Sequence, residues 1–506
     1  MPTNPDDDDF TTKTSLFTTW LSKNAIYISP KISIHDYRST TNQGRGIIAL
    51  EDIPENEPLF KIPRSAVLNI SNNSLMKEYP VDEYPEMWDR LMELDQWTGL
   101  IIVLWYEFSI HDKEGGSKWG DYLNVLPFKD DKDFNQLVFW NEEEIKGLRP
   151  SYVVERIGME KNRELFEDVC KVVKELKIKE LVDELSFEKF NKVASLIMSY
   201  SFDVEKVFHK EEQQEENDDE DDEEEEEVEY LKSMVPLADT LNANTHLNNA
   251  ILTYPQKDNP DNHLTMVSIK NITKGDQIYN IYSNHSNSEL LRRYGYVETT
   301  GSNYETGEIP LNIIKSFFIE KYNLDKEKLD IVLGMIDDEY KASNEEEEDI
   351  EDGILLDTFD VFDTGDVSLE LVFLIQILTI LNTSGSDDDS QTFIHRVFVK
   401  IYQLIESGRV TSNFIDNFKD ILKLRLNEYP ESSKDDFKEY TGDMTRSDMA
   451  EVLLKSEYKA IKKCQDSIQD KYKVIPDDKL IKNILKNDKK RQNDDKSTTS
   501  KKSKQK

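Results

Sequence analysis

Residues 279–298 read YNIYSNHSNSELLRRYGYVE, and residues 235–243 read VPLADTLNA. This part of the chain concentrates tyrosine and amide side chains. Elsewhere the sequence has no GxxxxGK[ST] phosphate loop, no HExxH zinc pair and no GxSxG elbow, so the usual short signatures of NTPases and hydrolases are absent. We therefore expect the chemistry of the chain to lie in these two blocks.

Two segments far apart in the sequence have the pattern of paired strands. Residues 46–62, GIIALEDIPENEPLFKI, predict two short strands around a Pro-Glu-Asn turn, and residues 264–282, LTMVSIKNITKGDQIYNIY, repeat that pattern around Lys274-Gly275-Asp276. Between them apolar residues recur at helical spacing: Trp97, Leu100, Ile101, Leu104 and Phe108, then Phe187, Phe190, Ala194, Ile197 and Val204. A helical insert at residues 76–205 thus interrupts a β domain, whose two parts we place at residues 20–75 and 231–304.

The remaining segments differ in composition. Residues 206–230 contain a run of acidic residues, which predicts a disordered loop, and a second acidic loop is expected at residues 343–353. Helical spacing returns over residues 305–475, for example from Phe393 to Ile405, with Gly408 as the expected stop. The basic tail, residues 476–506, is predicted to be disordered.

Composition limits the classes of protein to consider. A chain of 506 residues with 37% hydrophobic residues can build two or three domains despite a net charge of -39. Its two cysteines, Cys170 and Cys464, allow neither a disulfide framework nor a cysteine zinc site, and we expect no metal. The apolar run from Leu371 to Leu381 is too short to span a membrane. The acidic charge disfavours nucleic acid as a partner and suits a basic protein, although it could serve solubility alone.

Three blocks carry a resemblance to a known family: NQGRGIIALEDIPENEPLFKIPRSAVL at 42–68, VPLADTLNA at 235–243 and YNIYSNHSNSELLRRYGYVE at 279–298. In this order they resemble the SET domain, and more narrowly the branch with the Rubisco large-subunit and ribosomal-protein lysine methyltransferases. The resemblance covers roughly residues 20–475. It implies an α+β fold, in which a SET β-fold of small sheets is split by a helical insert and followed by an all-α substrate-binding domain.

The resemblance also implies a function and a set of site residues. The expected activity is transfer of a methyl group from S-adenosylmethionine to the ε-amine of a lysine in a basic protein, with a ribosomal protein as the expected partner. The family's catalytic tyrosine falls on Tyr282. The implied cofactor contacts are Gln43, Gly44, Arg45, Tyr200, Asn242, Ala243 and Tyr294, and the implied substrate contacts are Trp97, Asp239 and Tyr254. For Trp97 and Tyr200 a plain packing role is the alternative.

One residue departs from the common family pattern. Most SET proteins carry Asn-His where this chain has Asn242-Ala243, which leaves open a non-catalytic SET-fold protein that binds basic partners. A histone or transcription-factor methyltransferase is a further alternative. We expect a monomer in the nucleus and/or cytoplasm, because the LysLysArg and LysLysSerLys groups of the tail resemble a nuclear import signal. The acidic run before Val235 could steer a basic substrate or be a solvated insert.

Overall fold

The computed structural model describes residues 5–39, 43–111, 113, 116–128, 134–206, 229–254, 263–343, 353–385, 390–440 and 443–485, with only the backbone for residues 5–8. The acidic run from Glu211, most of the acidic stretch at 343–353 and the end of the tail lie outside these ranges. The chain divides into two compact units. The first comprises Met1–Ile145, Glu155–Glu298 and Glu439–Met449, and the second comprises Lys146–Val154, Thr299–Lys438 and Ala450–Lys506. The finer subdivision into two SET parts and an insert stays a prediction.

Two four-stranded sheets form the β part of the first unit. One has the order β1 (Tyr27–Ile28), β4 (Pro58–Pro63), β9 (His263–Ser268), β8 (Ala250–Thr253). The other has the order β2 (Ile32–Asp36), β3 (Arg45–Ala49), β10 (Gln277–Asn280), β7 (Asn242–Ala243). Both sheets pair strands from the two segments predicted as strands, because β4 pairs with β9 and β3 pairs with β10. The two distant segments therefore pair with each other in both sheets, as their repeated strand pattern predicts.

The strands have alternating burial, which is typical of a sheet with one face packed on a core. Along β9 the pattern is buried, buried, intermediate, buried, intermediate, buried, so one face joins the core and the other does not. The predicted turn before β10 is present, and Gly275 lies there with φ of +93°, a value that glycine adopts without a Cβ penalty. The turn leads the chain into β10, which lies between β3 and β7.

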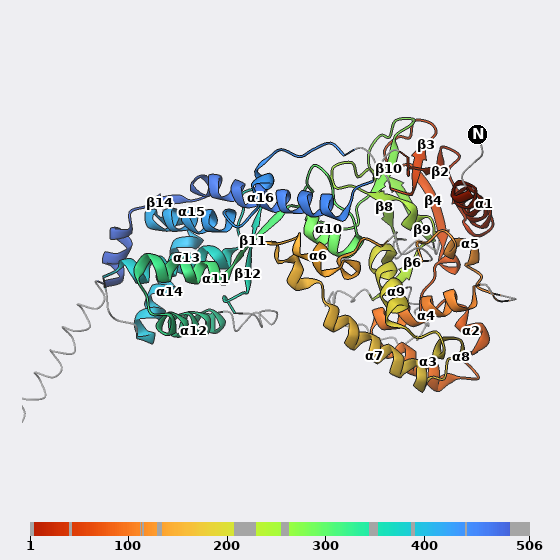
Figure 1. The fold of residues 1–506 in the computed structure, drawn as a ribbon, viewed down its shortest axis with the longest axis horizontal. Helices are drawn as coiled ribbons and strands as arrows, with labels where there is room; N and C mark the ends of the chain where they lie inside the picture. Colours follow the sequence, from red (N-terminus) through yellow and green to blue (C-terminus); the bar gives the residue numbers. More distant parts are fainter. Residues whose placement is uncertain are drawn as a thin grey trace, which may run out of the picture. The chain divides into compact units, whose positions relative to one another are not determined.

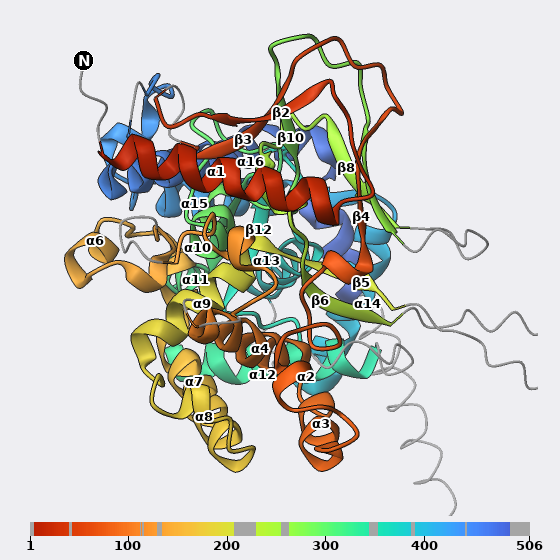
Figure 2. The same cartoon turned by 90° about the vertical axis from the view of Figure 1, so that its right-hand side faces the viewer.

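Helices supply the rest of the first unit. The longer ones are α1 (Pro5–Asn24), α3 (Pro85–Met92), α4 (Gln96–Ile110), α7 (Met159–Glu175), α9 (Phe187–Tyr200) and α10 (Asn287–Tyr294); the short ones are α2 (Leu75–Glu78), α5 (Gly120–Leu123), α6 (Glu142–Lys146, which ends at the unit boundary) and α8 (Lys179–Val182). Figures 1 and 2 show β2, β3 and β10 at one end of this unit and α2, α3, α7 and α8 at the other, with α4 and α9 between them.

Two of these helices begin where their sequence caps them. The Asp95 side chain accepts hydrogen bonds from the backbone N–H of Trp97 and Thr98, and Ser186 caps α9 through Lys189 N–H. The predicted helix from Phe187 ends earlier than expected, at Tyr200, and Val204 lies instead in the hairpin of β5 (Ser201–Glu205) and β6 (Tyr230–Met234). This helix therefore delivers Tyr200 at its last residue.

The N-terminal helix α1 was not predicted. It buries Phe17, Trp20 and Leu21 in the core of the first unit, and the Trp20 indole N–H donates to Lys118 O over 2.8 Å. The Phe17 ring lies 5.9 Å from the ring of Tyr122 on α5. Helix α1 is therefore an integral part of the unit that holds the site.

The second unit is mainly helical, with α11 (Leu311–Tyr322), α12 (Lys326–Ser343), α13 (Leu369–Thr383), α14 (Gln391–Glu406), α15 (Ser412–Leu426) and most of α16 (Arg446–Lys471). The expected helix that contains Phe393 and Ile405 is α14, and Gly408 follows it with φ of +70°. The expectation of an all-α domain needs correction, because β11 (Thr306–Pro310) pairs with β12 (Thr358–Phe362), and β13 (Arg409–Thr411) pairs with β14 (Lys473–Ile475).

The apolar run from Leu371 to Leu381 lies within α13, which is buried along most of its length. A continuous apolar pattern therefore marks the central helix of this unit. Among the described residues, no helix combines the length and the apolar character that crossing a bilayer requires.

The prediction of a disordered tail from residue 476 is wrong for its first part. Residues 477–485 are helical, and Leu480 and Ile484 on this helix are buried. The physical reason is that these two apolar side chains are spaced four residues apart and share one helix face. The basic groups of the tail itself lie outside the described residues.

Candidate active site

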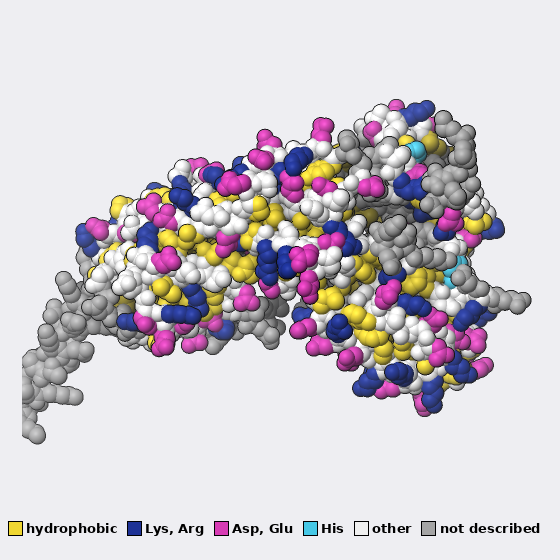
Figure 3. All heavy atoms as spheres, viewed as in Figure 1, with side chains coloured by type: hydrophobic (Ala, Val, Ile, Leu, Met, Phe, Trp, Pro, Cys, Tyr) yellow, Lys and Arg dark blue, Asp and Glu magenta, His cyan; other side chains and the backbone are white. Residues whose placement is uncertain are grey.

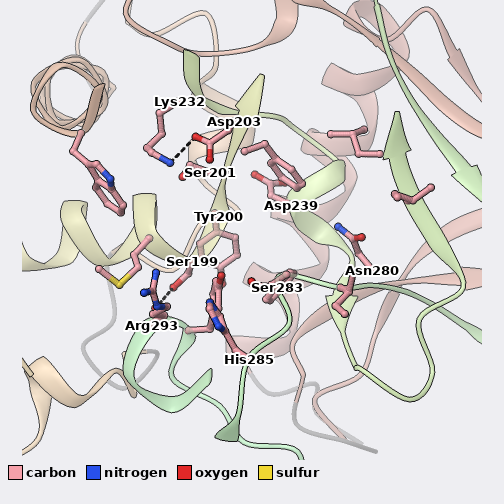
Figure 4. A pocket seen from close by; sticks show the side chains of 18 of the residues that line it. Ser199, Tyr200, Ser201, Asp203, Lys232, Asp239, Asn280, Ser283, His285 and Arg293 are labelled. Carbon is pink, nitrogen blue, oxygen red and sulfur yellow. Dashed lines mark hydrogen bonds and ion pairs between the residues drawn. The ribbon is translucent and has the colours of Figure 1, made fainter. Parts of the chain in front are cut away.

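A cavity of about 430 Å³ lies within the first unit. Its wall is built from α4, the junction of α9 and β5, β6, the turn at Ala238–Thr240, β8, the chain after β10, and α10. Figure 4 shows side chains from these elements turned toward one another. Six residues of the predicted set line the cavity: Trp97, Tyr200, Asp239, Tyr254, Tyr282 and Tyr294.

Tyr282 stands where the chain leaves β10. Its hydroxyl donates a hydrogen bond to Leu241 O over 2.9 Å, and its ring centroid lies 5.1 Å from that of Tyr294 and 6.2 Å from that of Tyr296. Burial raises the pKa of Tyr282 far above its usual value, with the nearby Tyr200 and Asp239 adding to the effect. The hydroxyl is therefore neutral at physiological pH and acts as a fixed donor.

Asp239 lies in a short 3-10 turn, Ala238–Thr240, directly after Leu237. Leu237 has φ of +75°, which is uncommon for a branched side chain and costs conformational energy. The Asp239 carboxylate accepts a hydrogen bond from the Tyr122 hydroxyl over 2.5 Å. Burial raises the pKa of Asp239 to about 7, although the bond from Tyr122 acts in the opposite direction. A carboxyl group that titrates near neutral pH thus faces the cavity.

Tyr122 is a residue that the sequence analysis missed. It comes from α5 in the helical insert, 117 positions before Asp239, and it is completely buried between α1 and the cavity wall. No motif surrounds it in the sequence. Only the folded structure, which brings α5 against the turn at Asp239, could reveal the contact.

The outer part of the cavity contains Tyr254 and Trp97. The Tyr254 hydroxyl donates to Asp203 O over 2.7 Å, and burial raises the pKa of Tyr254 to about 12. Trp97, the second residue of α4, is partly buried against the core and also lines the cavity. The ammonium of Lys232 lies 5.1 Å from the centre of the Trp97 ring and 2.7 Å from Asp203 Oδ1.

Five predicted cofactor residues do not line this cavity: Gln43, Gly44, Arg45, Asn242 and Ala243. They gather on the adjoining sheet. Strand β7 runs parallel to β10 with Asn242 opposite Tyr279 and Ala243 opposite Asn280, and Asn280 does line the cavity. The Asn242 amide donates to Arg45 O over 3.2 Å, and Gln43 Oε1 accepts a 3.4 Å hydrogen bond from the Tyr279 hydroxyl. The predicted residues therefore form one group beside the cavity.

Two glycines near this group, Gly44 and Gly46, leave the backbone without a covering side chain. Gly44 has φ of +67°, and a Cβ added to it would meet no atom within 4 Å, so its surface is open. At the neighbouring Gly46 an added Cβ would lie 2.7 Å from the side-chain amide nitrogens of Asn242 and Gln277, so a larger residue would displace both amides. The Arg45 guanidinium points to α1, where Nε donates to Thr14 Oγ1 over 2.9 Å. The Arg45 side chain is therefore engaged with α1, and its contact with the cofactor stays a prediction.

Other cavity residues were not assigned, although several lie in the quoted block 279–298, including Asn280, Ser283, His285 and Arg293. Arg293 is held in place by Glu289, whose Oε2 accepts from Arg293 Nε over 2.9 Å. Burial alone would raise the pKa of Glu289, but hydrogen bonds from Arg292 and Arg293 lower it to about 2. A guanidinium is thereby fixed at the cavity wall by a permanently ionised carboxylate.

Comparison with known proteins gives this geometry a context. Residues 44–283 match the SET domain. The chain is 38% identical to the ribosomal lysine N-methyltransferase 4 of Saccharomyces cerevisiae over 95% of this chain and 96% of that protein. The chain belongs to the SET-domain family of protein-lysine N-methyltransferases.

Two further proteins extend the comparison. The N-lysine methyltransferase setd6 of Xenopus laevis is 29% identical over 62% of this chain and 64% of its own length. A crystal structure described as the SET domain of LSMT bound to lysine and AdoHcy has a TM-score of 0.57 at 16% identity, covering 91% of this chain and 92% of that one. At this identity the likeness concerns the fold.

Within the SET domain, alanine stands at position 243, where most SET proteins carry histidine. Ala243 is buried, and it keeps its place in β7 opposite Asn280 of β10. The backbone path beside Asn242 therefore does not depend on a histidine side chain. Alanine removes an imidazole from this position and leaves the strand register intact.

Proposed function

We propose that this enzyme transfers a methyl group from S-adenosylmethionine to the ε-amine of a lysine in a ribosomal protein. The observation that carries the proposal is the position of Tyr282 and Asp239 in one cavity of the SET domain. One residue is a neutral hydroxyl whose proton is donated to Leu241 O, so its oxygen can accept a hydrogen bond from an amine N–H, and the other is a carboxyl group with a pKa of about 7. Together they match the two needs of the reaction, which are to orient an amine and to remove its proton.

The chief chemical obstacle is the protonation of lysine. Its pKa in water is about 10.4, so removing the proton at pH 7 costs roughly 4 to 5 kcal/mol. A cavity walled by Tyr200, Tyr282 and Tyr294 disfavours the ammonium form through desolvation. Asp239, when ionised, can accept a hydrogen bond from the entering ammonium, and the Tyr282 hydroxyl lies where it can orient the neutral amine.

The residues present also suit the cofactor, which when bound supplies a methyl group activated by a positively charged sulfur. The open surface at Gly44 lets a ligand approach the backbone. Beside Gly46, two residues along the chain, the buried amide nitrogen of Gln277 has no hydrogen-bond partner among the described residues. Gln43, Gly44, Asn242, Ala243 and Tyr294 would hold the cofactor, and the Arg293 guanidinium would pair with its carboxylate.

A ribosomal protein is the proposed substrate for two reasons. The relative with 38% identity is named for ribosomal lysine methylation. Ribosomal proteins are basic, and this chain carries a net charge of -39. On the face seen in Figure 3 acidic side chains are interspersed with basic ones, so the attraction we propose comes from the overall charge and the acidic runs of the sequence. The enzyme is proposed to act as a monomer on protein, without binding nucleic acid or membrane.

The test is methyl incorporation from labelled S-adenosylmethionine into purified ribosomal proteins, with core histones as the comparison substrate. The proposal expects label in a ribosomal protein and much less in histones. Label confined to histones would replace the proposed substrate class. Cofactor binding without label in either substrate would favour a SET protein that binds basic partners without methylating them.

We further propose residence in the nucleus and/or cytoplasm, on the basis of the LysLysArg and LysLysSerLys groups of the tail. Fluorescence microscopy of the tagged chain, with and without residues 486–506, tests this. Exclusion from the nucleus in both forms would remove the import role of the tail.

A further inference from the structure

We propose that Asp203 and Trp97 form a cation subsite at the cavity, which receives a Lys or Arg side chain neighbouring the target lysine of the substrate. Lys232 fills this subsite in the free enzyme. The inference rests on the proposed function, because it concerns how a basic substrate is recognised. It adds a binding site for a second side chain of that substrate.

The ammonium group of Lys232 marks the position of the subsite. Lys232 Nζ lies 2.7 Å from Asp203 Oδ1 and 5.1 Å from the centre of the Trp97 ring. A carboxylate and an aromatic face are the two groups that together favour a cation. Figure 4 shows the Lys232 ammonium and the Asp203 carboxylate directed at each other. All three residues line the cavity that contains Tyr282.

The exposure of the two charged side chains differs. The Lys232 side chain is 15% exposed, whereas that of Asp203 is 60% exposed. The Asp203 side chain therefore keeps surface open to solvent, which an arriving cation can reach. An ion pair with so exposed a partner contributes little net stability, so exchange of Lys232 for a substrate side chain meets little resistance.

The surrounding backbone holds the subsite in a fixed shape. Asp203 and Lys232 are opposite each other in the β5–β6 hairpin, and the Tyr254 hydroxyl fixes Asp203 O over 2.7 Å. The Lys232 N–H donates to the Gln96 side chain over 3.0 Å, which joins the hairpin to the start of α4 beside Trp97. A preorganised site of this kind binds a cation without first ordering its own groups.

Two substitutions distinguish a substrate-binding subsite from an ion pair that only stabilises the hairpin. Asp203→Asn removes the anion that attracts the substrate, whereas Lys232→Gln removes the internal competitor and leaves the anion available. Both break the same ion pair. The subsite therefore predicts effects of opposite sign, and an ion pair that only braces the hairpin predicts effects of the same sign.

The experiment measures kcat/KM for methylation of acid-extracted total ribosomal proteins at low and high salt. At low salt, Asp203→Asn should lower kcat/KM and Lys232→Gln should raise it, each by about two- to fivefold. High salt should reduce both effects. As matched controls, Lys31→Gln and Glu57→Gln remove an ion pair of 2.8 Å outside the cavity lining and should leave kcat/KM unchanged.

Each outcome has a distinct meaning. Opposite signs for Asp203→Asn and Lys232→Gln support the subsite, and a loss of folding cannot produce them. A similar decrease for both variants overturns the subsite while the proposed function stands. Absence of methylation by the wild-type enzyme refutes the proposed function and the inference with it.

Discussion

Each unit of this protein buries a carboxyl group whose pKa burial raises to about 7, Asp239 in the first unit and Glu457 in the second. Glu457 is 2% exposed, and its two oxygens accept hydrogen bonds from Ser151 Oγ over 2.6 Å and from the Tyr429 hydroxyl over 2.8 Å. Asp239 accepts from Tyr122 and also lines a cavity. The two groups share an environment that raises their pKa and differ in access to a ligand.

The network around Glu457 is closed. Arg425, which is 1% exposed, donates from Nε to Glu308 O over 2.9 Å and from Nη2 to the Tyr429 hydroxyl over 3.1 Å. Its donors are thus engaged within the unit, and none of these residues lines the cavity. A perturbed pKa therefore marks a structural network in one unit and a candidate reactive group in the other, and access decides between them.

The largest effect is expected for Tyr282→Phe. Removing a hydroxyl that orients the reacting amine should lower kcat by about 10²- to 10³-fold, while the ring and its packing remain. Single-turnover methyl transfer measures this, with Tyr429→Phe as the matched control that should retain kcat. Equal kcat for Tyr282→Phe and the wild type would remove Tyr282 from the chemistry.

Binding of the cofactor should raise the unfolding temperature of the first unit and leave that of the second unit unchanged. S-adenosylmethionine at 100 times its Kd should stabilise the unit that binds it by about 2.7 kcal/mol. Because its proposed binding residues belong to the first unit, we expect calorimetry to show an upward shift in the unfolding of that unit, provided that the units unfold separately. Arg293→Ala should weaken the shift. A shift that appears only in the unfolding of the second unit would place the cofactor elsewhere.

Tyr429→Phe should destabilise the second unit. It deprives buried Glu457 of a donor, which should lower the free energy of unfolding by about 1 to 3 kcal/mol. Urea unfolding followed by fluorescence measures the change. Tyr282→Phe should cost less, because the acceptor that it leaves is a neutral backbone carbonyl, whereas Tyr429→Phe leaves a buried carboxyl group short of a donor. The reverse order of the two losses would contradict the distinction between a closed and an open network.

The smallest effect concerns pH. If ionised Asp239 is the productive form, kcat/KM should rise as the pH increases through about 7. The Tyr122 hydrogen bond stabilises the carboxylate, so Tyr122→Phe should move this inflection to higher pH. The pH profile of kcat/KM for both proteins provides the measurement. An inflection at the same pH in both would show that Asp239 does not control the rate.

The stability of both units should carry the opposite pH signature. The folded-state pKa of each carboxyl group, about 7, exceeds the usual value of about 4 in an unfolded chain. Between these values the native state binds a proton that the unfolded state has lost, so the contribution of each group to stability falls as the pH rises. Activity and stability should therefore diverge between pH 5 and pH 8.

Much of the fold was predictable because its signals are local. The alternating strands at 46–62 and 264–282 and the helix containing Trp97 follow from residue spacing, and the resemblance to the SET domain supplied their order. The short pairs β11–β12 and β13–β14 were missed, because strands of three to five residues leave little periodic pattern. Helix α1 was missed because its apolar residues are few and are followed by no motif.

The candidate site also has a part that the sequence predicts and a part that it does not. Tyr282, Asp239 and Tyr254 lie at family motifs, and the structure brings them to one cavity. Tyr122 and the opposed pair Asp203 and Lys232 depend on tertiary contacts between segments that carry no motif. Such contacts are properties of the packed structure, and a single sequence contains no local signal for them.

The central claim is that lysine methylation takes place in the cavity around Tyr282. The most direct measurement is amino-acid analysis of ribosomal proteins after incubation with labelled S-adenosylmethionine and either the wild-type enzyme, Tyr282→Phe or Tyr429→Phe. We predict labelled ε-N-methyllysine with the wild type and with Tyr429→Phe, and almost none with Tyr282→Phe. Label in a residue other than lysine, or equal methyllysine with all three proteins, would contradict this account.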